Sequence, residues 1–111
     1  MRVLVVWELG GGYGHVAQLP QLAQQLAQAG HEAVFALRDL SQVEMSLGRQ
    51  GLRLLQAPLW LPRPAGLPPT ANYAELLYTC GYLEVERLGA VVRAWRELYA
   101  LVAPDVVLLN H

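Results

Sequence analysis

Apolar residues along the chain follow two patterns, continuous short runs and repeats at helical spacing. The continuous runs have strand length and lie at residues 2–7, 31–37, 52–56 and 105–109. Continuous rather than alternating apolar character is typical of parallel strands that are covered on both faces. The repeats at helical spacing lie between the runs, the longest of them over residues 83–102. Pro20 is tolerated only near the start of a helix, so the first helix is predicted to begin between His15 and Ala17 and to end at Gly30.

The alternation of strands and helices predicts an α/β fold. Right-handed crossovers then give a Rossmann-like parallel sheet with the expected strand order 3-2-1-4. In this order the fourth strand is an exposed apolar edge, because no helix follows it in the chain. Residues 1–111 are therefore expected to be part of a larger protein. The alternative is that a second chain covers this edge, by self-association through the fourth strand.

Two segments between the regular elements carry local signals. Ser41 and Glu44 form a capping box, which predicts a short helix that closes at Gly51. Residues 57–70 contain five prolines and no periodicity, which predicts an irregular loop. The apolar Trp60 in this loop is a candidate ligand-binding residue, and packing against the domain is the alternative.

Composition narrows the class of protein. A hydrophobic content of 54% supports one buried core, and a net charge of −1 with eight arginines and no lysine gives no support for nucleic-acid binding. Cys80 is the single cysteine, so no disulfide framework and no cysteine-based metal site is expected, and no carboxylate cluster suggests a metal either. Neither a secretory signal nor a membrane span is visible, so a cytoplasmic location is expected.

The stretch from Gly10 to Pro20, GGGYGHVAQLP, lies where the first strand turns into the first helix. Glycine permits a tight turn and lets other atoms approach the backbone closely. The N-terminus of the helix presents unpaired N–H groups and the positive end of its dipole, which suits a phosphate or another anion. His15 lies at the mouth of this turn, where the dipole disfavours the charged imidazolium.

One interpretation of the glycines is an NAD(P)-binding Rossmann domain. Residues 12–17 match G-x-G-x-x-A between a strand and a helix, and Asp39 lies roughly where a ribose-binding acid belongs. Two features weigh against this interpretation. Residues 8–11 lengthen the loop before the motif, and Pro20 interrupts the first helix early.

A second interpretation follows from a family resemblance. The residues that carry it are Gly14-His15, Pro20, Leu22-Ala23, Leu26-Ala27, residues 30–36 (GHEAVFA) and residues 104–109 (PDVVLL). This pattern resembles the N-terminal segment of GT-B glycosyltransferases, in particular the bacterial family 1 and UDP-glucuronosyltransferase-like enzymes. The resemblance extends over nearly the whole chain.

The resemblance implies two Rossmann-like domains that face each other across a cleft. The N-terminal domain binds the acceptor, a small or lipid-like molecule, and the C-terminal domain binds the nucleotide sugar, expected here to be a UDP- or dTDP-sugar. The implied reaction is inverting transfer of the sugar to an acceptor hydroxyl, with no cofactor or metal. Residues 1–111 are then part of the acceptor-side domain, and without the donor-binding domain this chain alone is expected to be inactive.

The same resemblance assigns roles to individual residues. His15 holds the position of the general base, which deprotonates the acceptor hydroxyl. Asn110 holds the position where the family commonly has an Asp that orients this base, and an amide can accept a hydrogen bond from the imidazole. Gly11, Gly12 and Gly14 are expected to shape the backbone near the donor phosphates. Two further candidate substrate-binding residues rest on position, Trp60 in the apolar loop and His111 beside Asn110.

A third interpretation is non-catalytic. An incomplete domain with an exposed apolar strand at its edge is physically suited to be an interaction module. This interpretation and the enzymatic one differ in whether a second Rossmann-like half with a nucleotide-sugar pocket follows His111 in the protein.

Overall fold

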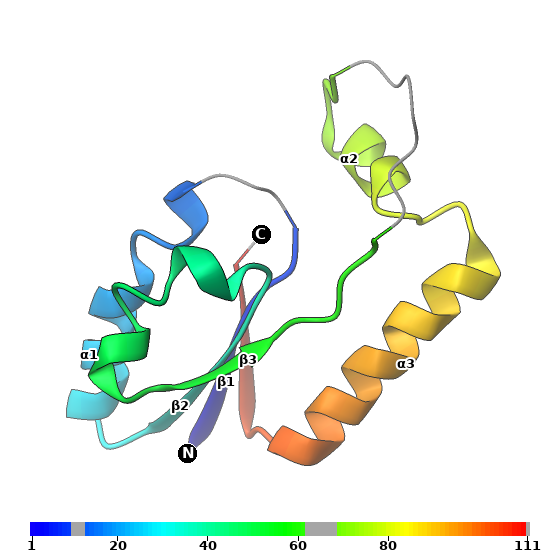
Figure 1. Ribbon diagram of the computed structural model, residues 1–111. Helices are drawn as coiled ribbons and strands as arrows, with labels where there is room; N and C mark the ends of the chain where they lie inside the picture. The colour runs from blue at the N-terminus through cyan, green and yellow to red at the C-terminus, as the bar shows by residue number, and fades with distance from the viewer. Residues whose placement is uncertain (10–12, 62–68, 111) are drawn as a thin grey trace.

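The centre of the fold is a four-stranded parallel sheet. The computed structural model describes residues 1–9, 13–61 and 69–110. The strands of this sheet are β1 (Arg2–Trp7), β2 (Glu32–Leu37), β3 (Arg53–Gln56) and β4 (Val106–Asn110). They are parallel and follow the order β3-β2-β1-β4 (Figure 1). The predicted fold class and strand order are therefore confirmed.

Two helices cover opposite faces of the sheet. α1 (Leu19–Gln28) lies on the face formed by Val3, Val5 and Trp7, and α3 (Val85–Val102) lies on the face formed by Leu4 and Val6 (Figure 1). Each face has its own apolar cluster, because successive side chains of a strand point to opposite sides. β1 is thus buried on both faces and paired along both edges, as its continuous apolar run predicts.

The start of α1 differs from the prediction. The helix begins at Leu19, and His15 belongs to a separate 3-10 turn, η1 (Tyr13–His15), that precedes it. A start between residues 15 and 17 would place Pro20 where a helical N–H has to be donated, whereas a start at Leu19 keeps Pro20 in the first turn. His15 therefore lies ahead of α1 and not at its N-terminus.

The prediction of a helix after Ser41 is also wrong. This segment forms two 3-10 turns, η2 (Leu40–Gln42) and η3 (Gly48–Gln50). The cap of η2 is Asp39, whose side chain accepts a hydrogen bond from the backbone N–H of Ser41. Ser41 is thereby drawn into the turn instead of capping a helix, and the capping box is not formed.

The connection from β3 to β4 contains α2 (Tyr73–Thr79) and then α3. Asn72 caps α2 by accepting a hydrogen bond from the N–H of Glu75 at 2.9 Å. Gly81 interrupts the helical path with a φ of 86°. The Trp60 indole lies against the backbone of Gly81, so the loop after β3 packs on the turn between the two helices.

The two edges of the sheet differ in chemistry. β4 forms one edge, and its side chains from Val106 to Leu109 are exposed, Leu109 by 60%. β3 forms the other edge and carries the exposed polar residues Arg53 and Gln56. Charged and polar side chains discourage a further strand from pairing, so the β4 edge is the less protected of the two.

Within the described ranges, helices are either too short or too polar to cross a membrane.

Gly81→Ala is predicted to destabilise the fold through the contact with Trp60. The new Cβ would overlap the indole, which adds about 1–3 kcal/mol to the cost of a left-handed backbone. Gly51→Ala is the matched control, since φ at Gly51 is 70° and the space around its Cβ position is open. Urea unfolding followed by circular dichroism measures both, and equal losses of stability would show that the Trp60 contact contributes nothing.

Candidate functional site

The candidate site lies at the carboxyl ends of the strands, where ligands bind in open α/β sheets. The segment after β1, the segment after β2 and the last residue of β4 meet at this edge. His15 comes from the first of these segments, Asp39 from the second and Asn110 from the third.

The His15 side chain is half-buried and stacked on an aromatic platform. Its ring lies 6.0 Å from the Trp7 ring, centroid to centroid, at an interplanar angle of 14°. Trp7 is fully buried, and its indole N–H donates a hydrogen bond to the carbonyl of Leu9 at 3.0 Å. The imidazole thus lies nearly parallel to a buried, hydrogen-bonded indole.

Asn110 ties the end of β4 to the turn that contains His15. Its amide nitrogen donates a hydrogen bond to the backbone carbonyl of His15 at 2.6 Å. The structure thus brings together the two residues that the sequence analysis paired. The bond is made to the backbone rather than to the imidazole, so Asn110 positions the turn as a whole.

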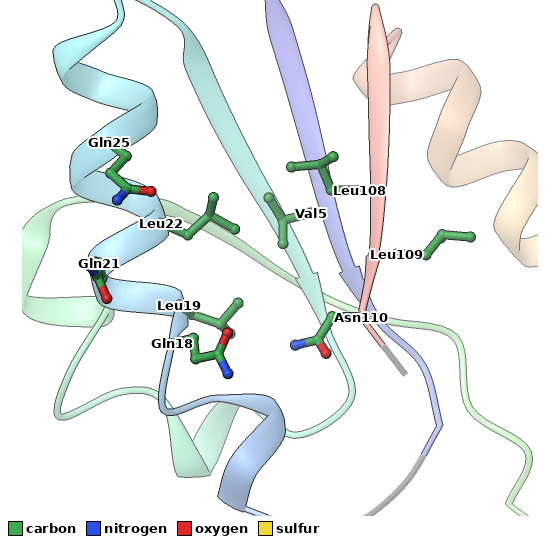
Figure 2. A pocket seen from close by; sticks show the side chains of 9 residues that line it. All are labelled: Val5, Gln18, Leu19, Gln21, Leu22, Gln25, Leu108, Leu109 and Asn110. Atoms are coloured by element: carbon green, nitrogen blue, oxygen red, sulfur yellow. The ribbon is translucent and has the colours of Figure 1, made fainter.

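A cleft of about 390 Å³ opens beside Asn110, between α1 and β4 (Figure 2). Figure 2 shows the Asn110 amide pointing toward α1, with Gln18 nearby. The cleft is lined by apolar and amide side chains without a single charge: Val5, Leu19, Leu22, Leu108, Leu109, Gln18, Gln21, Gln25 and Asn110. Such a lining suits a neutral ligand that has both apolar and hydrogen-bonding parts.

The predicted substrate-binding residues fall into three groups. Gly14 lies in η1 beside His15 and has open space around its Cβ position. Gly11, Gly12 and His111 lie outside the described residues. Trp60 lies on the α3 side of the sheet, together with residues of α3, so the structure does not group it with His15 on the α1 side.

Glu8 is a residue that the sequence analysis did not select. It follows β1 directly and lines a small hollow together with Arg38, Trp60 and Tyr82. Partial burial, and after it the negative charge of Glu8, raise the pKa of the Tyr82 phenol. The sequence did contain a signal that could have singled out Glu8. No other Asp, Glu, Arg or Lys lies between Arg2 and Glu32.

Asp39, the acid expected to bind a ribose under the dinucleotide interpretation, is engaged within its own turn. Its carboxylate accepts hydrogen bonds from the Ser41 hydroxyl and N–H and from the Gln42 amide. The hydrogen bond from the Ser41 side chain is the main reason why the pKa of Asp39 lies below its ordinary value of 3.8. Both carboxylate oxygens therefore have a structural role in η2.

In the part of the chain that the structure describes, no three His, Cys, Asp or Glu side chains gather into a possible metal site. Comparison with known proteins adds no assignment, because no protein-family model, no curated protein and no solved structure matches the chain.

Removal of the Asn110 donor is predicted to loosen the turn that holds His15. Asn110→Ala loses the hydrogen bond, at a cost of about 0.5–1.5 kcal/mol in the free energy of unfolding. Asn110→Asp costs more, because a carboxylate then faces the His15 carbonyl oxygen. Gln18→Ala is the control, as its amide is exposed and makes no capping bond. Urea unfolding with no difference among the three variants would contradict this role of Asn110.

The Asp39 cap is predicted to make stability depend on acid pH. Because the pKa of Asp39 is lowered in the folded state, its contribution is complete above the ordinary value of 3.8 and is lost as the pH falls through the lowered value. Asp39→Asn keeps a capping oxygen but cannot titrate. The Tm of the wild type is therefore expected to fall more steeply than that of the variant between about pH 5 and pH 2. Parallel curves would exclude this linkage.

Proposed function

We propose that this chain belongs to the acceptor-binding domain of an inverting GT-B glycosyltransferase that uses a nucleotide sugar. The observation that carries the proposal is the hydrogen bond from Asn110 to the His15 carbonyl. It supports the proposal because the Gly14-His15 turn and the end of β4, which resemble two separate motifs of this family, meet at the ligand-binding edge of the sheet.

In the proposed reaction, His15 is the general base. The acceptor hydroxyl gives its proton to a ring nitrogen of His15 while its oxygen attacks the anomeric carbon of the donor sugar. The bond from that carbon to the diphosphate breaks, and the nucleoside diphosphate leaves from the opposite face, which inverts the anomeric configuration. The Trp7 stack and the Asn110 bond hold the base in place, as a base needs a fixed geometry.

The uncharged cleft between α1 and β4 is the proposed position of the acceptor. Asn110 lines this cleft and holds the His15 backbone, so an acceptor in the cleft would lie near the turn that carries the base. The donor, a UDP- or dTDP-sugar, is assigned to a second domain that residues 1–111 do not contain. Glycosyl transfer is accordingly proposed for the whole protein.

An interaction module is the second candidate function. The exposed apolar side chains of β4 favour it, because this edge of the sheet offers a surface for another strand, including that of a second copy. A dinucleotide-binding role is favoured less, since the Asp39 carboxylate is committed to Ser41 and Gln42.

His15→Ala in the protein with its donor-binding domain is predicted to lower kcat by about 10²–10⁴-fold, the usual contribution of a general base. The measurement is release of UDP or dTDP from a panel of nucleotide sugars in the presence of hydroxyl-bearing acceptors. The KM for the donor is expected to stay unchanged, because His15 lies in the acceptor domain.

His31→Ala is the matched control. His31 is also half-buried, but it lies at the amino end of β2, where its Nδ1 contacts the N-terminal amine at 3.2 Å. The control is expected to keep the full rate. An equal rate in His15→Ala and in the wild type would remove His15 from the mechanism.

A further inference from the structure

A small hollow lies on the side of the sheet opposite to His15. It is enclosed by the end of β1, the segments after β2 and β3, and the first half of α3. The lining residues are Glu8, Leu9, Arg38, Pro58, Trp60, Cys80, Tyr82, Leu88 and Val91. Its volume is about 20 Å³, which is room for one water molecule or one hydroxyl group.

The Glu8 carboxylate is a hydrogen-bond acceptor at the lining of this hollow. Among the described residues it has neither a hydrogen-bond partner nor an ion-pair partner. It nevertheless lies close enough to Tyr82 and Tyr99 for its charge to raise the pKa of both phenols, second to the effect of partial burial. Its oxygens are therefore uncommitted and can accept a hydrogen bond from a ligand in the hollow.

Arg38 supplies the complementary charge. Its guanidinium donates one hydrogen bond to the backbone carbonyl of Glu8 at 2.8 Å, which fixes the group at the hollow and leaves further N–H donors. A cationic ligand would be repelled by Arg38, and an anionic one by Glu8. A neutral hydroxyl fits both, because it donates to the carboxylate and accepts from the guanidinium.

Trp60 and Tyr82 add aromatic walls to the hollow. The position of Trp60 is set by its contact with Gly81, so the indole is held in place before any ligand arrives. Aromatic side chains beside a hydrogen-bond donor and a hydrogen-bond acceptor suit a cyclic ligand that has hydroxyl groups at its rim and C–H groups on its faces.

We propose that this hollow binds one hydroxyl group of a neutral, polyhydroxylated ligand of the sugar class, with Glu8 as hydrogen-bond acceptor and Arg38 as donor. This ligand site is separate from the cleft proposed for the acceptor, because the two lie on opposite faces of the sheet. Glu8 directly follows Trp7, on which His15 stacks, so the hollow and the proposed base flank the end of β1 from its two sides.

The test is a titration of the ¹⁵N-labelled chain with methyl β-D-glucopyranoside, followed through the indole N–H resonance of Trp60. A saturable shift is expected for the wild type. Glu8→Gln is expected to weaken binding at least about tenfold, since hydrogen bonds to a charged group are the strong ones. Glu97→Gln, which removes an exposed carboxylate of α3, is the matched control and is expected to bind like the wild type.

A second measurement does not depend on any variant being folded. The fully O-methylated glucoside keeps the ring but has no O–H donor, so the wild type is expected not to bind it. A wild-type Trp60 resonance that does not shift, equal binding by Glu8→Gln, or equal binding of the methylated sugar would each overturn the proposal. No step of this test uses a donor sugar or His15. Failure here therefore leaves glycosyl transfer standing, and inactivity of the whole protein leaves the hollow standing.

Discussion

The constraint on which this structure depends is the burial of β1 from Val3 to Trp7. The strand pairs with β2 on one side and β4 on the other, and its side chains enter an apolar cluster on each face of the sheet. A strand in that position cannot shift by one residue without exchanging its two faces. The positions of Trp7 and Glu8, on opposite sides of the sheet at the end of β1, follow directly from this register.

The fold was largely predictable because it depends on hydrophobic patterning. Four continuous apolar runs became four parallel strands in the expected order. The predictions were wrong where a single residue determines which local structure forms. The Asp39 carboxylate accepts a hydrogen bond from the N–H of Ser41, and a 3-10 turn forms there instead of a helix. α1 begins at Leu19, where the missing N–H of Pro20 costs no helical hydrogen bond. Such choices depend on atomic contacts that periodicity does not record.

The candidate site was predictable only in part. The pairing of His15 with Asn110 followed from family resemblance, whereas the atoms that join them required coordinates. Trp60 was selected because it is an apolar residue in a long irregular loop, and the structure places it on the other face of the sheet from His15. Glu8 was missed since one acidic residue after a strand resembles an ordinary solvated charge until its neighbours are known.

The two hollows at this edge differ in how they respond to the surrounding solution. From Leu9 to His31 the chain carries no Asp, Glu, Arg or Lys, and the residues that the structure describes around the cleft between α1 and β4 contribute amides and hydrocarbon. A contact with these uncharged side chains has no charge–charge interaction that dissolved ions could screen. Glu8 and Arg38, by contrast, are charged and partly exposed, so counter-ions can screen their interactions. Ionic strength therefore acts on the two sides of β1 unequally, and the electrostatics of the glutamine-lined side change little from dilute buffer to concentrated salt.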